Sequence, residues 1–308
     1  MAGASRRSAK LGGMTNAMLS AVLSASLAAC ISGNRVVEFE SVERRTEPTQ
    51  AEYQAELSTA DATIADAMRV IAQAPSLEAL ELALGLSEVA VLSVVNELSA
   101  VPSPPEARLT HLRLLPGLRL FAQDLSRVGQ EVTTGQICAA SAALVRIGGL
   151  EGVEELRAVQ TAFAANSAPS SYQFGGSLPE PRVLPDRRPA NGEMVLDRRG
   201  SGDGILEISN TADLPAVVTL AGGARAIASI YVADGETATL DGIAGATYAV
   251  YYTTGADWDP DLDTFTRDCQ FHKVDQPFDF TAASRFALEL EALAATEVDP
   301  ASYPRDLS

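Results

Sequence analysis

Five aspartates lie close together in the C-terminal third of the chain, four of them at alternating positions: Asp257, Asp259, Asp261, Asp263 and Asp268. Alternating carboxylates can direct oxygen ligands toward one point, and these five fall at positions one, three, five, seven and twelve of an EF-hand-like frame. Leu262 stands where the sharp turn of that frame takes glycine, and Pro260 restricts the backbone between two ligands. The pattern predicts either a calcium loop or a solvated acidic loop between strands, and it indicates no other cofactor.

Cys30 follows a segment that is typical of export signals. Arg6, Arg7 and Lys10 precede an apolar stretch, and no acidic residue occurs before Cys30. Residues 14–29 are too few, and too rich in serine and alanine, for a comfortable transmembrane helix. We therefore expect residues 1–29 to be a signal peptide.

The end of this segment, Leu27-Ala28-Ala29-Cys30, resembles the lipobox of bacterial lipoproteins. The resemblance implies cleavage before Cys30 and a diacylglyceryl group on its thiol. Two acyl chains hold a protein stably at a membrane, so it also implies an extracytoplasmic protein anchored to the cell membrane. Two alternatives stay open: ordinary secretion with cleavage after Ala28, and a cysteine that stands at this position by chance.

Cys138 and Cys269 are the two remaining cysteines. In an oxidising exported compartment two thiols pair more often than they stay free, which predicts a disulfide between them. The alternative is a pair of buried, inert cysteines. They lie too far apart in the sequence, with too few partners, to suggest a zinc site.

Net charge and composition limit the classes of molecule that this protein is expected to bind. The 308 residues carry a net charge of −17, a balance that repels phosphate backbones and makes nucleic acid an improbable partner. It repels anionic lipid headgroups as well, so membrane attachment is expected through the lipid on Cys30. At 46% hydrophobic residues the chain can bury real cores.

The N-terminal half has a helical pattern. Residues 30–49 carry mixed charge and little apolar periodicity, which indicates a tether. Apolar residues then recur at steps of three and four over 50–164, with breaks at Pro75 and near Pro102. Short connections between such helices favour an antiparallel helical bundle. In the first helix the expected core stripe is Tyr53, Leu57, Ala60, Ile64, Ala67 and Ile71.

The C-terminal half has a strand pattern. Residues 165–203 are rich in proline and indicate a linker, and from Gly204 the apolar period shortens to two. The expected strands lie in 205–209, 216–220, 226–232, 237–240, 248–252, 268–273, 278–280 and 286–290. Many short strands with no helix between them predict an antiparallel β-sandwich over 204–308. The fold class is therefore α+β in two domains.

Residues 203–308 also resemble a bacterial β-domain that recurs in exported and lipid-anchored proteins. The resemblance is carried by residues 205–210, 216–220 and 230–236, by the Gly-x-Asp-Trp-Asp core at 255–259, and by residues 265–267 and 278–280. It implies an all-β fold and an exported context, and it brings no catalytic residues.

Histidine, the side chain most often used for acid–base catalysis near neutral pH, is scarce in this chain. His111 and His272 are the only histidines, and no Gly-x-Ser-x-Gly elbow marks a nucleophile, so we assign both to structural or surface roles. Trp258, the one tryptophan, is expected to be a packing residue. We therefore expect a non-enzymatic envelope component that binds or scaffolds an unknown envelope protein or polymer. A hydrolase of peptidoglycan or envelope polysaccharide using carboxylates, and a calcium-stabilised adhesion module, remain alternatives.

Overall fold

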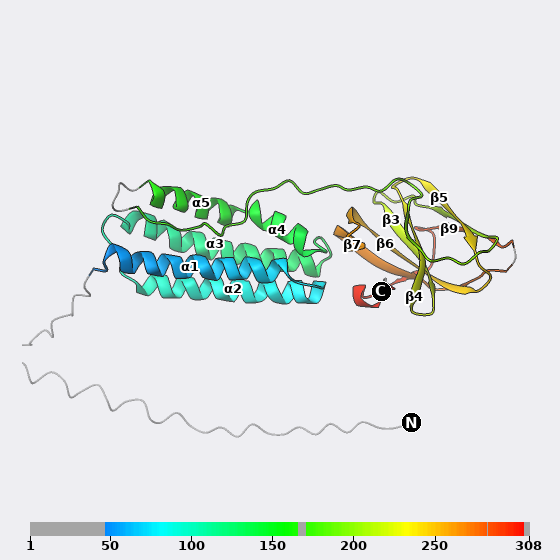
Figure 1. Ribbon diagram of the computed structural model, residues 1–308, viewed down its shortest axis with the longest axis horizontal. Helices are drawn as coiled ribbons and strands as arrows, with labels where there is room; N and C mark the ends of the chain where they lie inside the picture. Colours follow the sequence, from blue (N-terminus) through cyan, green and yellow to red (C-terminus); the bar gives the residue numbers. More distant parts are fainter. Residues whose placement is uncertain (1–46, 166–170, 282, 305–308) are drawn as a thin grey trace, which may run out of the picture. The chain divides into compact units, whose positions relative to one another are not determined.

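A computed structural model describes residues 47–165, 171–281 and 283–304. Within these ranges five α-helices come first and ten strands follow, so the chain is α+β in two regions, as predicted (Figure 1). Both regions belong to one compact unit of the chain, Thr46–Ser308. Cys30, the expected signal peptide and nearly all of the expected tether lie outside the described residues.

The helices begin and end where the sequence provides caps and breaks. They are α1 (Gln50–Ala72), α2 (Leu77–Ala100), α3 (Arg108–Thr133), α4 (Ala140–Gly148) and α5 (Glu151–Ala164). Thr49 and Glu52 form a capping box at α1, because each side chain accepts a hydrogen bond from the other's backbone N–H. Ser76 caps α2 by accepting from the N–H of Ala79 at 3.2 Å.

One hydrophobic core joins the helices. All six apolar residues predicted for the inner face of α1 are buried in it. In this core α1 packs on α2, α2 on α3, and α3 on α5. Tyr172, Phe174 and Leu178, which follow α5, are buried in the same core. No helix among the described residues is both long and apolar enough to cross a membrane.

The strands form two sheets. They are β1 (Met194–Asp197), β2 (Gly204–Ser209), β3 (Ala216–Gly222), β4 (Arg225–Val232), β5 (Thr237–Ile243), β6 (Thr247–Asp259), β7 (Thr264–Val274), β8 (Phe278–Asp279), β9 (Arg285–Glu289) and β10 (Ala295–Glu297). The seven-stranded sheet has the order β1-β4-β3-β6-β7-β10, with β8 also paired to β6. The three-stranded sheet has the order β5-β2-β9. All pairs are antiparallel except β2 and β9, which run parallel.

Apolar residues of both sheets share one core. Leu206 and Leu240 of the small sheet and Val218 and Val250 of the large sheet are among its buried members. The strands differ from the sequence pattern in several places. Strand β1 lies inside the proline-rich range 165–203, and β10 lies outside every expected strand range. Strands β6 and β7 extend well beyond the expected 248–252 and 268–273. The extension turns most of the acidic segment into the arms of a β-hairpin.

Candidate functional site

The acidic segment forms the tip of the β6–β7 hairpin. Asp257 and Asp259 lie at the end of β6, Asp261 and Asp263 lie in the turn, and Asp268 lies in β7. Asp257, Asp263 and Asp268 have φ values of 60°, 50° and 52°, the left-handed region that aspartate tolerates better than most residues.

Arg187 binds the two aspartates at the end of β6. Its Nε donates to Oδ1 of Asp257 and its Nη2 to Oδ2, both at 2.8 Å, and its Nη1 lies 2.9 Å from Oδ2 of Asp259. The backbone N–H of Arg187 also donates to Asp257 Oδ1 at 2.9 Å. The hydroxyl of Thr266 donates to Asp257 Oδ2 at 2.7 Å. We call Arg187, Asp257, Asp259 and Thr266 the hairpin clamp.

The clamp keeps a buried carboxylate ionised. Burial by itself raises the pKa of Asp257, but the hydrogen bonds from Arg187 and Thr266 outweigh it and lower the pKa to about 2. The hydrogen bonds of Arg187 with Asp257 and Asp259 raise the pKa of the guanidinium above its ordinary value. Both partners are therefore charged at neutral pH, and the clamp fastens the segment before β1 to the hairpin.

The clamp engages two of the five carboxylates proposed as calcium ligands. A calcium ion would have to compete with the guanidinium of Arg187 for Asp257 and Asp259. Among the described residues, no group of three or more His, Cys, Asp or Glu side chains is placed to hold a metal ion. The calcium loop stays a prediction.

Trp258 lies between the two clamp aspartates and faces away from water. It is buried and packs edge-on against Phe265, with ring centroids 5.1 Å apart. Val217 and Tyr231 belong to the same apolar cluster. Trp258 is therefore a packing residue, and no face of its ring is open to stack on a ligand.

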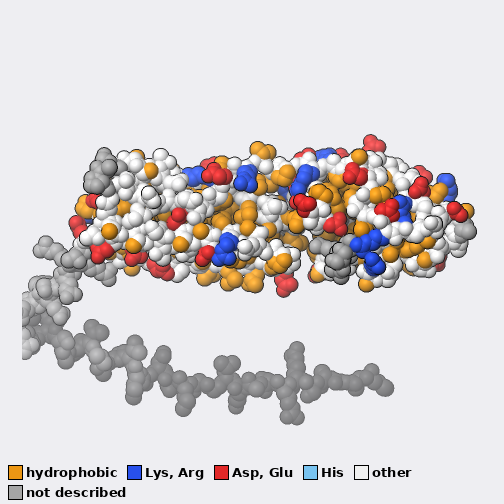
Figure 2. Space-filling view, viewed as in Figure 1, with side chains coloured by type: hydrophobic (Ala, Val, Ile, Leu, Met, Phe, Trp, Pro, Cys, Tyr) orange, Lys and Arg blue, Asp and Glu red, His pale blue; other side chains and the backbone are white. Residues whose placement is uncertain are grey.

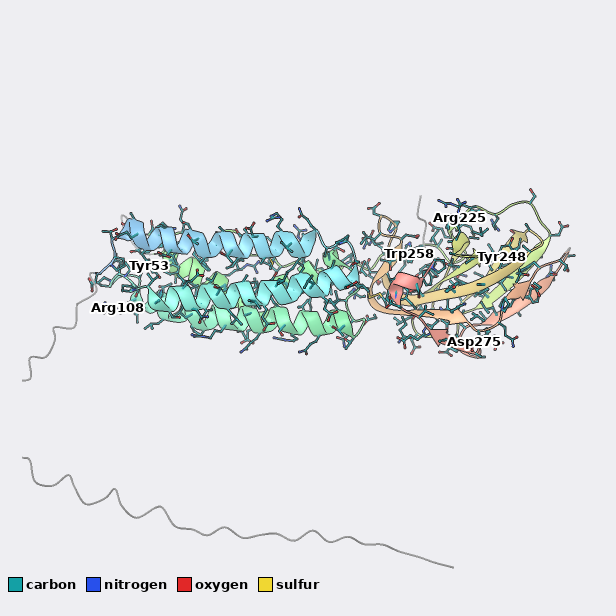
Figure 3. All side chains as sticks on the ribbon, turned by 90° about the horizontal axis from the view of Figure 1, so that it is seen from below. Tyr53, Arg108, Arg225, Tyr248, Trp258 and Asp275 are labelled. Carbon is teal, nitrogen blue, oxygen red and sulfur yellow. A yellow bond between two sulfur atoms is a disulfide. The ribbon has the colours of Figure 1, made fainter. Side chains whose placement is uncertain are left out.

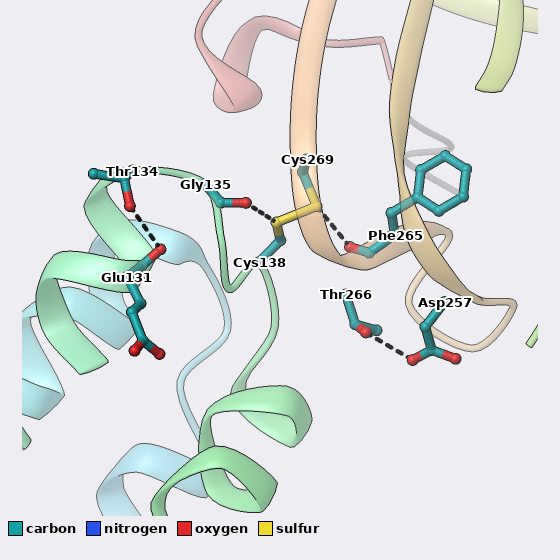
Figure 4. Close-up of a disulfide and its surroundings, with 8 residues drawn as sticks. All are labelled: Glu131, Thr134, Gly135, Cys138, Asp257, Phe265, Thr266 and Cys269. Carbon is teal, nitrogen blue, oxygen red and sulfur yellow. Dashed lines mark hydrogen bonds between the residues drawn. A yellow bond between two sulfur atoms is a disulfide. The ribbon is translucent and has the colours of Figure 1, made fainter. Parts of the chain in front are cut away.

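A disulfide connects the helical region to the β region. Cys138, between α3 and α4, is joined to Cys269 of β7 (Figure 4). The backbone N–H of Cys138 donates to the carbonyl of Thr266, and the N–H of Cys269 donates to the carbonyl of Gly135, both at 2.8 Å. Gly135 has a φ of +74°, and a Cβ there would lie 2.7 Å from the carbonyl oxygen of Cys269. This junction thus depends on glycine as well as on the cysteines.

The two histidines lie in different regions. His111 is buried in α3, where its Nδ1 lies 2.8 Å from the hydroxyl oxygen of Tyr53 (Figure 3 labels Tyr53), and burial lowers its pKa. His272 of β7 stacks on Tyr252, with ring centroids 4.7 Å apart. In the described part of the chain, neither imidazole hydrogen bonds to a serine hydroxyl, a thiol or a carboxylate. Among the described residues, the structure therefore gives neither histidine the hydrogen-bonded partners of a serine- or cysteine-type catalytic group.

A second apolar face of α2 was missed by the sequence analysis. Leu82, Leu86, Val89 and Leu92 are 62%, 58%, 65% and 38% exposed, on the side of the helix opposite its buried residues. Figure 2 shows hydrophobic side chains gathered along the lower edge of the helical region, where α2 runs. We call these four residues the α2 outer stripe. The sequence does carry a signal for this stripe, because its four residues are separated by steps of four, three and three positions, which is the spacing of one helix face.

Comparison with known proteins identifies no relative: no protein-family model, curated protein or solved structure matches the chain. The resemblances of residues 27–30 to a lipobox and of residues 203–308 to a bacterial β-domain stay predictions.

Proposed function

We propose that this chain is a lipid-anchored extracytoplasmic protein of a bacterial cell envelope, and that it binds or scaffolds another envelope component without catalysing a reaction. The anchor is a diacylglyceryl group on Cys30, at the end of the lipobox-like segment. In this proposal residues 30–49 tether the folded part of the protein to the membrane surface.

The observation that carries the proposal is the disulfide between Cys138 and Cys269. Glutathione and thioredoxin keep most cytosolic thiols reduced, whereas disulfides persist in exported compartments. A structural disulfide therefore agrees with the export signal, although the two features come from separate parts of the sequence. The binding role is supported by the exposed α2 outer stripe, because apolar side chains gathered on a surface commonly mark an interaction site.

We further propose that the helical region is an antiparallel bundle and that the two sheets form a β-sandwich. Short connections between α1, α2 and α3 and the core that they share support the bundle. The core shared by the large and small sheets supports the sandwich.

The test is the intact mass of the chain extracted from membranes of a bacterial host, with and without reductant. We expect the mass of residues 30–308 plus a diacylglyceryl group, and a gain of two hydrogen atoms on reduction. The matched control is Cys30→Ser, which should abolish the lipid and leave the chain's disulfide intact. A mass without lipid, from a chain that starts at Ala29, would mean simple secretion and would overturn the anchor.

A further inference from the structure

We propose that the α2 outer stripe is the docking surface for a basic amphipathic helix, one whose apolar face is flanked by lysine or arginine, carried by another envelope protein. This inference deepens the proposed function by naming the class of its partner. Helix α2 is apolar on two opposite faces. Its inner face is already packed in the helical core by Leu80, Leu84, Val91 and Leu98.

The outer stripe has the form of a helix-binding ridge. Leu82, Leu86 and Val89 follow one another at steps of four and three residues, so they line one side of α2 over two turns. Gly85 lies on the same side, and a Cβ there would meet nothing within 4 Å. The ridge is therefore interrupted by a notch that opens outward, into which a side chain of a second helix can pack.

The charges on α2 decide what kind of helix fits. The helix carries Glu78, Glu81, Glu88 and Glu97 and no lysine or arginine. None of these four glutamates forms an ion pair with another residue in the described ranges, and two of them accept a hydrogen bond from a neutral hydroxyl. Thr133 donates to Glu81 at 3.2 Å and Ser93 donates to Glu97 at 3.0 Å. These carboxylates are left available for cations on a partner.

The same charges argue against a second copy of this chain as the occupant. Two α2 helices packed face to face would bring glutamates together along both sides of the contact, in a protein whose net charge is already −17. Like charges that meet in an interface disfavour a partner, whereas complementary charges speed and orient association. A helix with an apolar face and basic flanks matches both the exposed apolar residues of the stripe and the glutamates of α2.

The experiment measures peptide binding to the full chain carrying Cys30→Ser, which removes the acylation site and changes no described residue. The probe is a fluorescent amphipathic peptide of about 20 residues, because shorter isolated helices are marginal in water. It has leucines along one face and lysines beside them. Its matched control has glutamate in place of every lysine. We expect saturable binding of the lysine peptide, weakened by salt, and no binding of the glutamate peptide.

Three double variants test where the peptide binds. Leu86→Gln with Val89→Gln should weaken binding of the lysine peptide by about tenfold or more, since truncating central apolar contacts has effects of this size. Leu109→Gln with Leu112→Gln is the matched control, because these leucines are 80% and 60% exposed but belong to α3 and not to the stripe. It should leave the affinity unchanged. Glu81→Gln with Glu97→Gln should weaken binding at low salt and reduce its salt dependence.

Three outcomes would overturn the proposal: equal binding of the two peptides, equal effects of the α2 and α3 leucine variants, or failure of the lysine peptide to bind. Sedimentation of the same chain tests the other occupant, since dimerisation abolished by Leu86→Gln with Val89→Gln would assign the stripe to a second copy. The chain assayed carries no lipid. Its result therefore stands apart from the mass measurement, and either proposal can fail alone.

Discussion

Arg187 and Asp257 lie 70 positions apart in the sequence and face each other through two parallel hydrogen bonds of 2.8 Å. The carboxylate is buried, whereas the guanidinium keeps contact with water. Paired bonds of this kind fix orientation as well as distance, so Arg187 sets where the segment before β1 meets the β6–β7 hairpin.

Asp257→Asn should therefore destabilise the protein. The amide keeps the shape of the side chain but removes the charge opposite Arg187. Since that guanidinium is partly solvated, we expect a loss of about 2–3 kcal/mol in the free energy of unfolding, which is less than for a pair in which both partners are buried. Urea unfolding measures it. The control is Asp261→Asn at the exposed turn, which should change the free energy by less than about 0.5 kcal/mol. Equal effects of the two variants would contradict a structural role for the clamp.

Acid should weaken the protein through the same residue. The pKa of Asp257 is about 2 in the folded chain and near its ordinary value of 3.8 when unfolded. A lowered pKa adds stability that is fully present above the unfolded value and is lost as the pH falls through the folded one. Unfolding free energy should thus decline between about pH 4 and pH 2.

This pH dependence is tested by comparing the free energy of unfolding of the wild type with that of Asp257→Asn at each pH. Asp197, whose pKa its hydrogen bonds with Arg199 also lower to about 2, contributes in the same window in both proteins. The difference in unfolding free energy should shrink toward acid pH. A difference that stays constant from pH 5 to pH 2 would mean that Asp257 does not titrate as described.

Reduction of the disulfide should cost substantial stability. Cys138 and Cys269 are separated by 131 positions, and closing a loop of this length restricts the unfolded chain by about 5 kcal/mol in the chain-entropy model. Unfolding in urea with and without dithiothreitol measures the difference, and Cys138→Ser with Cys269→Ser should reproduce the reduced protein. If the double variant unfolds at the same urea concentration as the oxidised chain, the cross-link has no stabilising role.

Two helix glycines should respond to alanine in opposite directions. A Cβ on Gly152 of α5 would lie 2.6 Å from the backbone of Phe121 and 2.8 Å from Oδ2 of Asp124, so Gly152→Ala should destabilise by about 1–3 kcal/mol. Gly85→Ala meets no atom and should stabilise by up to about 1 kcal/mol, because alanine is the better helix former. Thermal unfolding compares them. A loss of stability in both variants would contradict the expectation that helix propensity decides the effect of alanine at Gly85.

The helices could be predicted because their information is local. Tyr53, Leu57 and Ile64 repeat at helical spacing and are buried as expected, and Pro75 with Ser76 marks the boundary between α1 and α2. The prediction missed Tyr172, Phe174 and Leu178, which fill the helical core from an aperiodic segment. Irregular chain that packs on a core carries no period for a sequence pattern to detect.

The acidic segment was hard to assign for a physical reason. Aspartate is disfavoured in strands, so Asp257 and Asp259 indicated a loop between strands, yet both lie in β6. They are tolerated there because Arg187, a partner far away in the sequence, forms ion pairs with both.

The outer stripe of α2 was not predicted for another reason. Once Leu80 and Leu84 account for the core, a sequence alone does not say which further leucines stay exposed.

The cross-link also has a mechanical consequence. When the protein is pulled by its two ends, the disulfide carries load directly from Cys138 to Cys269, which are 131 positions apart, and shields the segment between them. Fully drawn out, that segment would add about 450 Å of contour length. Helices α4 and α5 and strands β1 to β6 lie within the shielded segment. A taut chain would extend through α1, α2, α3 and the last strands, and the rest of the fold would bear no tension until the sulfur–sulfur bond was cut.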